Sequence, residues 1–65
     1  MKGHHLKKLR NQLGLSIADA SAQVHVAERT WLRWEAGEKR IPEAVVELFC
    51  TKNGLPYPPV KEANQ

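Results

Sequence analysis

The sequence predicts an all-α domain of four short helices followed by a proline-rich tail. Apolar residues recur at helical spacing in four segments, and three of these segments end at a glycine: Gly14, Gly37 or Gly54. The chain has 65 residues, which suffices for one domain but leaves no room for a deep catalytic cleft. We therefore expect the helical domain to occupy residues 1–54 and an extended tail to occupy residues 55–65.

The first helix is expected at residues 4–13. Leu6, Leu9 and Leu13 recur there at spacings of three and four, which places them on one helical face. Gly14 follows the last leucine, at the position where a helix often ends in a left-handed residue.

The second helix begins after Ser16, a favourable N-cap residue, with Asp19 three positions later as in a capping box. Its inward residues, Ala20 and Ser21, are small, so we expect another helix to pack very close to it. The helix ends near Val24, and only three residues, 25–27, separate it from the next helical segment.

The third helix, at about residues 27–36, has two unlike faces. A rotation of 100° per residue places Trp31 and Trp34 on one side with Ala27 and Thr30, where the indole rings supply much of the burial that a small core needs. The opposite side carries charged residues around one large apolar residue: Glu28, Arg29, Leu32, Arg33 and Ala36. A face left to water would more usually carry Glu and Lys pairs, so this face is predicted to contact a partner.

The fourth helix has Pro42 in its first turn and Gly54 at its end. Its apolar stripe is Val45, Leu48 and Phe49, flanked by Val46 and Cys50. The tail after it holds three prolines within four positions and is expected to run extended. The four helices together predict a core of Leu9, Leu13, Ala20, Val24, Trp31, Trp34, Leu48 and Phe49.

The charge balance is basic. Ten Lys and Arg residues stand against seven Asp and Glu residues, which gives a formal net charge of +3 and an isoelectric point near 9.4. This excess favours a polyanionic partner, although an ordinary solvated surface explains the charge alone equally well. The position of the charges must therefore decide between the two interpretations.

Several classes of site and location are disfavoured. Cys50 is the single cysteine, which excludes an intramolecular disulfide and fits a reducing compartment, and the three histidines (4, 5 and 25) have no zinc-ligand spacing with it. No nucleophile–base pair or carboxylate dyad is present, so we expect no enzyme, and no metal, cofactor or small-molecule ligand. No apolar stretch suits a membrane span or a signal peptide, which predicts a cytoplasmic protein.

Two short helices, a three-residue turn, and a second helix with a basic outer face describe a helix-turn-helix. From this point the chain resembles the lambda-repressor-like, Cro/CI-type (XRE) transcriptional regulators over about residues 5–52. The likeness is carried by residues 15–37 and by the pattern Trp34-Glu35-x-Gly37-x-x-x-x-Pro42. A second, narrower likeness is to the anti-CRISPR-associated phage autorepressors. It is carried by Arg29-Thr30-Trp31-x-x-Trp34-Glu35-x-Gly37, followed by Ile41-Pro42.

The resemblance implies a buried ion pair between Arg10 of the first helix and Glu35 of the third. It also marks three departures. His25 stands where the family usually has a glycine, although histidine tolerates a left-handed conformation. Ile17 stands where the family often has a DNA-contacting glutamine, which leaves more of the readout to the third helix. A proline-rich tail replaces the fifth helix through which many family members dimerise.

The outer face of the third helix is predicted to read base edges in the major groove. Arg29 and Arg33 can each bind guanine through two hydrogen bonds, and Leu32 can contact a thymine methyl group. Glu28 can accept a hydrogen bond from cytosine, or only repel phosphate at the wrong sequences. Phosphate contacts are expected from Ser16, Lys39 and Arg40.

We therefore expect a transcriptional regulator that binds double-stranded DNA, and specifically a repressor of phage or mobile-element type. DNA binding would associate it with the nucleoid. A homodimer on a palindromic operator is expected, joined through the fourth helix and the apolar tail residues Leu55, Tyr57 and Val60, which alternatively only cover the core. The alternative function is a protein-interaction module of antitoxin or polymerase-binding type, which would use the Arg29/Leu32/Arg33 face to bind an acidic partner.

Overall fold

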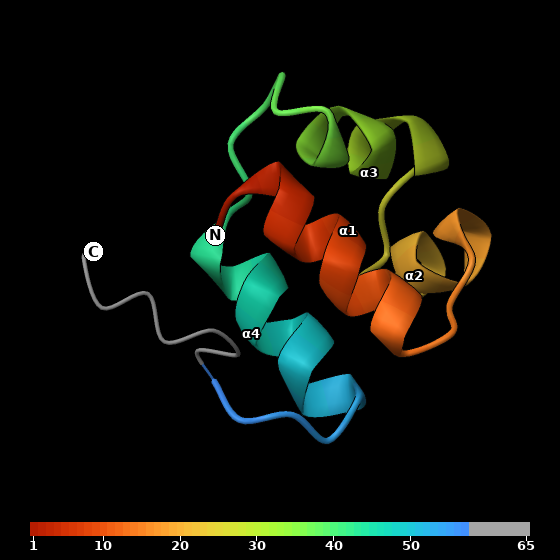
Figure 1. Cartoon of the computed structure of the whole chain (residues 1–65), viewed down its shortest axis with the longest axis vertical. Coiled ribbons are helices and arrows are strands. Elements are labelled where there is room, and N and C mark those ends of the chain that lie inside the picture. Colours follow the sequence, from red (N-terminus) through yellow and green to blue (C-terminus); the bar gives the residue numbers. More distant parts are fainter. Residues whose placement is uncertain (58–65) are drawn as a thin grey trace.

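The computed structural model, which describes residues 1–57, consists of helices and short loops, and this part of the chain contains no strand (Figure 1). The all-α class predicted from the sequence is therefore confirmed. The helices are α1 (Gly3–Gln12), α2 (Ile17–Gln23), α3 (Glu28–Glu35) and α4 (Glu43–Lys52).

The helix ends follow the capping signals closely, with two exceptions. Ser16 caps α2, because its Oγ accepts a hydrogen bond of 3.0 Å from the backbone N–H of Asp19. Pro42 is the N-cap of α4 and lies just before its first turn, not within it. Ala27, expected on the inner face of the third helix, is instead the exposed N-cap of α3, because the chain is still extended at that residue.

The turn between α2 and α3 contains the left-handed residue that the sequence indicated. His25 has φ = +60°, a conformation that costs most L-residues about 1–2 kcal/mol and that glycine adopts freely. The turn therefore keeps the tight geometry that a glycine would give, with some backbone strain.

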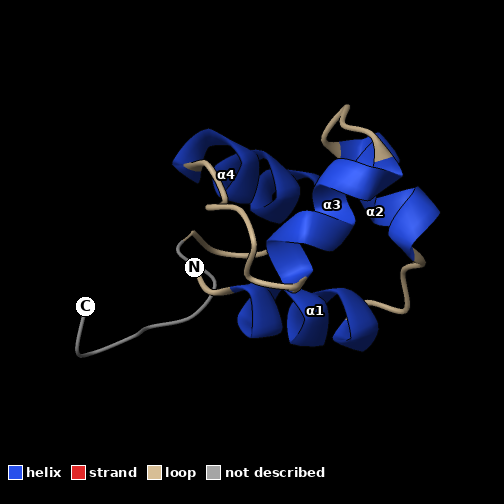
Figure 2. Ribbon diagram, turned by 90° about the horizontal axis from the view of Figure 1, so that it is seen from above, coloured by secondary structure: helices blue, strands red, loops and turns tan. Residues whose placement is uncertain are grey.

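α3 lies at one end of the molecule, where it packs against both α1 and α2, while α2 also contacts α4 (Figure 1). Figure 2 looks down on α3 from that end, with α1 beside it and the other two helices behind. One long side of α3 therefore lies against the core and the other is free to meet a partner.

The core is centred on three aromatic rings. The ring centroid of Trp31 lies 5.8 Å from that of Trp34 and 5.3 Å from that of Phe49, and these side chains are buried. The expected core residues Ala20 and Val24 are buried as well. The other buried apolar residues are Leu6, Ile41, Val46 and Cys50.

Three of the expected core residues lie at the edge of the core. Leu9, Leu13 and Leu48 are half-buried and pack against it from outside. In α4 the inward residues are Val46, Phe49 and Cys50, so the helix is rotated relative to the stripe that the sequence suggested. Cys50 is buried, and burial raises the pKa of its thiol.

α1 crosses the end of α3 at very short range through Gly3. A Cβ atom at this position would clash with the backbone carbonyl of Trp34 and would lie 2.7 Å from the carbonyl oxygen of Glu35. Only a residue without a Cβ permits this approach. Gly3 therefore sets how closely the first turn of α1 packs on the last turn of α3.

The first residues of the tail return toward α4. Leu55 is half-buried against the core, and the hydroxyl of Tyr57 donates a hydrogen bond to Glu43 at the start of α4. Tyr57 is 43% exposed. Val60, the third apolar residue expected in a dimer surface, lies outside the described residues.

Candidate nucleic-acid interface

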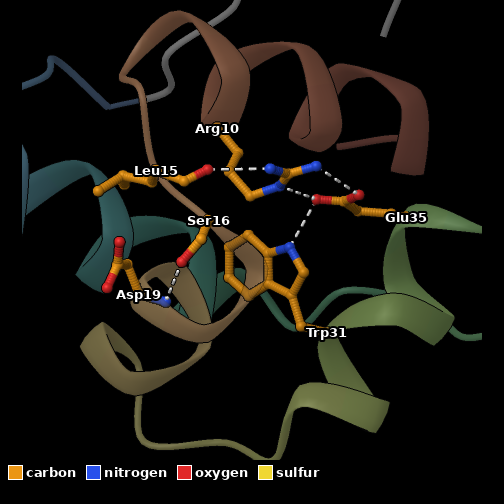
Figure 3. Close-up of polar contacts among 6 residues, drawn as sticks. All are labelled: Arg10, Leu15, Ser16, Asp19, Trp31 and Glu35. Atoms are coloured by element: carbon orange, nitrogen blue, oxygen red, sulfur yellow. Dashed lines mark hydrogen bonds and ion pairs between the residues drawn. The ribbon is translucent and has the colours of Figure 1, made fainter.

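A buried polar network holds α3 against α1 (Figure 3). Arg10 Nε donates to Glu35 Oε2 at 2.6 Å and Arg10 Nη2 donates to Glu35 Oε1 at 3.3 Å. The indole N–H of Trp31 donates to the same Oε2 at 2.6 Å, and Arg10 Nη1 donates to the carbonyl oxygen of Leu15 at 2.9 Å. The Arg10 and Glu35 side chains are only 11% and 7% exposed.

This network contains the ion pair that the resemblance implied and two partners that it did not. Arg10 joins α1 to α3 through Glu35, and to the loop before α2 through Leu15, so three segments share one guanidinium. Trp31 and Glu35 are four residues apart on one helix, a spacing that brings side chains together and that was available in the sequence. The network fixes the orientation of α3 on the domain.

The outer face of α3 carries all four residues expected to contact bases. Glu28, Arg29, Leu32 and Arg33 are exposed, and Leu32 is 51% exposed although it is a large apolar residue. Arg29, Leu32 and Arg33 are spaced by three and four residues, so they lie side by side on the helix. This face combines two planar cations with one apolar contact, which suits the edges of base pairs.

The loop after α3 carries the expected phosphate contacts Lys39 and Arg40, both exposed. Ile41, which is buried, anchors the end of this loop in the core. Beside the loop lies an open groove of about 560 Å³, whose opposite wall is the first turn of α1. Ser16, the third expected contact, is exposed at the start of α2. Its Oγ accepts from the backbone N–H of Asp19, and its hydroxyl proton is still available to donate.

A family model described as a helix-turn-helix domain matches residues 3–63 of the chain. The chain belongs to the helix-turn-helix domain family. Comparisons with curated proteins and with solved structures find no match. Family membership supports DNA binding and the regulation of transcription. In the structure, α2, the tight turn at His25 and α3 form the helix-turn-helix unit, with α3 as its second helix.

The helix-turn-helix unit is tied to α4 by side chains that sequence reasoning did not identify. Asn53, just after α4, donates to Gln23 Oε1 at 2.7 Å and to the carbonyl oxygen of Phe49 at 2.8 Å. The Lys52 ammonium lies 3.4 Å from His25 Nε2 in the turn. These contacts brace the end of α2 and the turn, the two segments that determine how α3 projects.

Among residues 1–57 no group of three or more metal-binding side chains gathers at one place. In the same part of the chain no helix is long and apolar enough to cross a membrane. The exposed face of α3 with its neighbouring loop, where cationic side chains gather around one exposed leucine, is the candidate site.

Proposed function

We propose that this helix-turn-helix protein is a sequence-specific repressor that binds duplex DNA with α3 in the major groove. The observation that carries the proposal is the division of α3 into two faces. Trp31 and Trp34 hold the helix in the core, while Arg29, Leu32 and Arg33 are exposed together on the other side. The likeness to anti-CRISPR-associated autorepressors supports a phage or mobile-element repressor.

Base recognition rests on the two arginines of α3. A guanidinium can donate two parallel hydrogen bonds to O6 and N7 of guanine, and each good pair of this kind discriminates against the wrong base by about 1–3 kcal/mol. Leu32 lies between Arg29 and Arg33 on this face and meets a thymine methyl group. Glu28, at the first turn of α3, accepts from cytosine or excludes other bases.

Backbone contacts come from both sides of α3. Lys39 and Arg40 follow the helix in an exposed loop, and Ser16 precedes α2 with a hydroxyl that can donate to a phosphate oxygen. Such contacts fix the position of the protein on DNA and add affinity for any sequence. Replacing Lys39 and Arg40 should therefore weaken specific and random binding alike, and should lower the salt slope by about one per charge.

Assembly as a homodimer on a palindromic operator completes the proposal. A single module of this kind buries about 600–1,000 Å² of protein surface on DNA, which gives limited selectivity. Two copies would read half-sites about 10 bp apart. Of the tail residues, Leu55 packs against its own core and contributes little surface, whereas Tyr57 and the exposed side of α4 remain available.

The decisive experiment is a selection of binding sites from random duplex DNA, followed by titrations of the wild type and of Arg33→Ala. We expect one enriched palindrome and a loss of about 1–3 kcal/mol for Arg33→Ala on it, with binding to random duplex preserved. Equal losses on both duplexes would reassign Arg33 to the phosphates. An absence of salt-dependent binding to any duplex would instead favour the protein-interaction module, because that module has no phosphate contacts to lose.

A further inference from the structure

Positive charge continues beyond the α3 loop onto the first turn of α1. The groove of about 560 Å³ has Lys39 and Arg40 on the loop side and Lys2 and His4 on the α1 side. Its two acidic residues are Glu38 and Glu35, and Glu35 is already neutralised by Arg10. The groove therefore keeps a net positive charge and suits an anion.

The outer face of α1 extends this charge. His4, Lys7 and Lys8 are exposed and spaced by three and four residues, so they share one side of the helix, where Asn11 and Gln12 follow. α1 contains no Asp or Glu to offset them. Because His4 borders both the groove and this face, the two form one surface.

Apart from Glu35 and Glu38 in the groove and Glu28 on α3, the acidic side chains of the described residues lie on α2 and α4. Glu43 and Glu47 are exposed on α4, and Asp19 lies on α2. The molecule is therefore electrically asymmetric, with a basic side formed by α1 and the α3 loop. An asymmetry of this kind orients a protein toward a polyanion and strengthens the attachment of its basic side.

We propose that this surface, here called the α1 strip, binds the sugar–phosphate backbone of the duplex that flanks the half-site read by α3. The α1 strip consists of Lys2, His4, Lys7, Lys8, Lys39 and Arg40. The proposal rests on the proposed function and deepens it, because it names the protein surface that contacts the DNA outside the half-site. DNA is the occupant that the strip fits, since the strip is continuous with the phosphate-contacting loop.

The dimensions and the residue types suit flanking backbone. α1 has ten residues and is about 15 Å long, which corresponds to the rise of about four base pairs along the duplex axis. Lysine is a compact cation on a flexible stem, so it can follow a phosphate without requiring a base sequence. The α1 strip therefore adds affinity and salt dependence, and leaves sequence selection to α3.

The test compares the wild type with Lys7→Gln/Lys8→Gln on the selected operator, in duplexes with about 10 bp of flanking DNA and in duplexes trimmed to the half-sites. Affinity is measured by fluorescence anisotropy between about 50 and 200 mM salt. Each lost phosphate contact lowers the salt slope by about 0.9, so the double variant should lose about 1.8 in slope on the long duplex. The ratio of wild-type affinity to variant affinity for the long duplex should then be about twelvefold greater at about 50 mM salt than at about 200 mM salt.

Trimming the flanks should weaken the wild type more than Lys7→Gln/Lys8→Gln, because the variant has already lost two of the cations of the α1 strip. Lys52→Gln is the control for the loss of a positive charge outside the α1 strip. It also removes the exposed contact with His25, so only its flank dependence is compared, and this should equal that of the wild type. A double variant with the full flank dependence of the wild type would overturn the α1 strip. Failure of the wild type to bind any duplex would overturn the proposed function itself, so the two failures are distinguishable.

Discussion

Replacement of Glu35 is expected to lower the free energy of unfolding strongly. Its carboxylate accepts hydrogen bonds from Arg10 Nε, Arg10 Nη2 and Trp31 Nε1, and its side chain is 7% exposed. Glu35→Ala leaves a nearly buried guanidinium with only the carbonyl oxygen of Leu15, and leaves the buried indole N–H of Trp31 without its acceptor. Breaking a buried pair from one side costs about 3–5 kcal/mol. A chain of 65 residues is stabilised by about 3–10 kcal/mol in total, so this variant should lose a large share of its stability and should unfold at a much lower urea concentration.

The matched variant removes both charges. Arg10→Met/Glu35→Leu fills a similar volume with apolar atoms, and replacement of a whole buried pair is commonly neutral or stabilising. We expect its free energy of unfolding to lie within about 1–2 kcal/mol of the wild type, with the lost Trp31 hydrogen bond as the main cost.

Urea denaturation followed by tryptophan fluorescence measures both variants, because Trp31 and Trp34 are buried in the native state. A loss below about 1 kcal/mol for Glu35→Ala would refute the reasoning, because that is the value of an exposed pair. Equal losses in the single and the double variant would also refute it, since they would show that the uncompensated charge is not the source of the cost.

Three further changes test the backbone and the tail. Gly3→Ala should cost about 1–3 kcal/mol in the same urea experiment, because its Cβ meets rigid backbone at the end of α3, and an unchanged stability would contradict that close approach. His25→Gly should gain about 0.5–1 kcal/mol by relieving a positive φ, whereas a loss would show that the exposed contact to Lys52 outweighs the strain. Tyr57, the single tyrosine, donates to Glu43, and this hydrogen bond raises the pKa of the phenol to about 12. The phenolate absorbance should therefore appear near pH 12 in the wild type and at a lower pH in Glu43→Gln, which lacks the carboxylate, and equal midpoints would rule the contact out. A raised phenol pKa means that this contribution to stability is complete below about pH 10 and is lost as the pH rises toward 12.

The helices were predictable because each is marked by local chemistry. A serine cap begins α2, and residues with positive φ end the elements at Gly14, Gly37 and Gly54. The rotation of α4 was not predictable in the same way. Its apolar residues fall on several sides, so periodicity alone does not decide which ones face inward. Packing of Phe49 against Trp31 decides it, and that contact joins segments far apart in the chain.

The candidate site likewise has features that could be predicted from the sequence and features that could not. The exposure of Arg29, Leu32 and Arg33 follows from helical geometry once Trp31 and Trp34 are placed inside, so the sequence sufficed for it. Two other features had no such signal. The bond from Arg10 to Leu15 ends on a backbone carbonyl, which every residue has, and the fit of Gly3 depends on where α3 ends in space.

Because the two faces of α3 carry different residues, substitutions on the exposed face can change the proposed base recognition with little effect on the stability of the fold. Changes at exposed helical positions usually alter stability by less than about 0.5 kcal/mol, whereas loss of a buried aromatic side chain costs about 3–5 kcal/mol. Substitutions at Arg29, Leu32 or Arg33 therefore leave the domain folded and free to recognise other sequences. Trp31 cannot change in this way, because its ring fills the core and its N–H is bound by Glu35. If the proposed function holds, a small domain with little stability to lose can thus acquire new operators on one side of a helix while the other side keeps that helix in place.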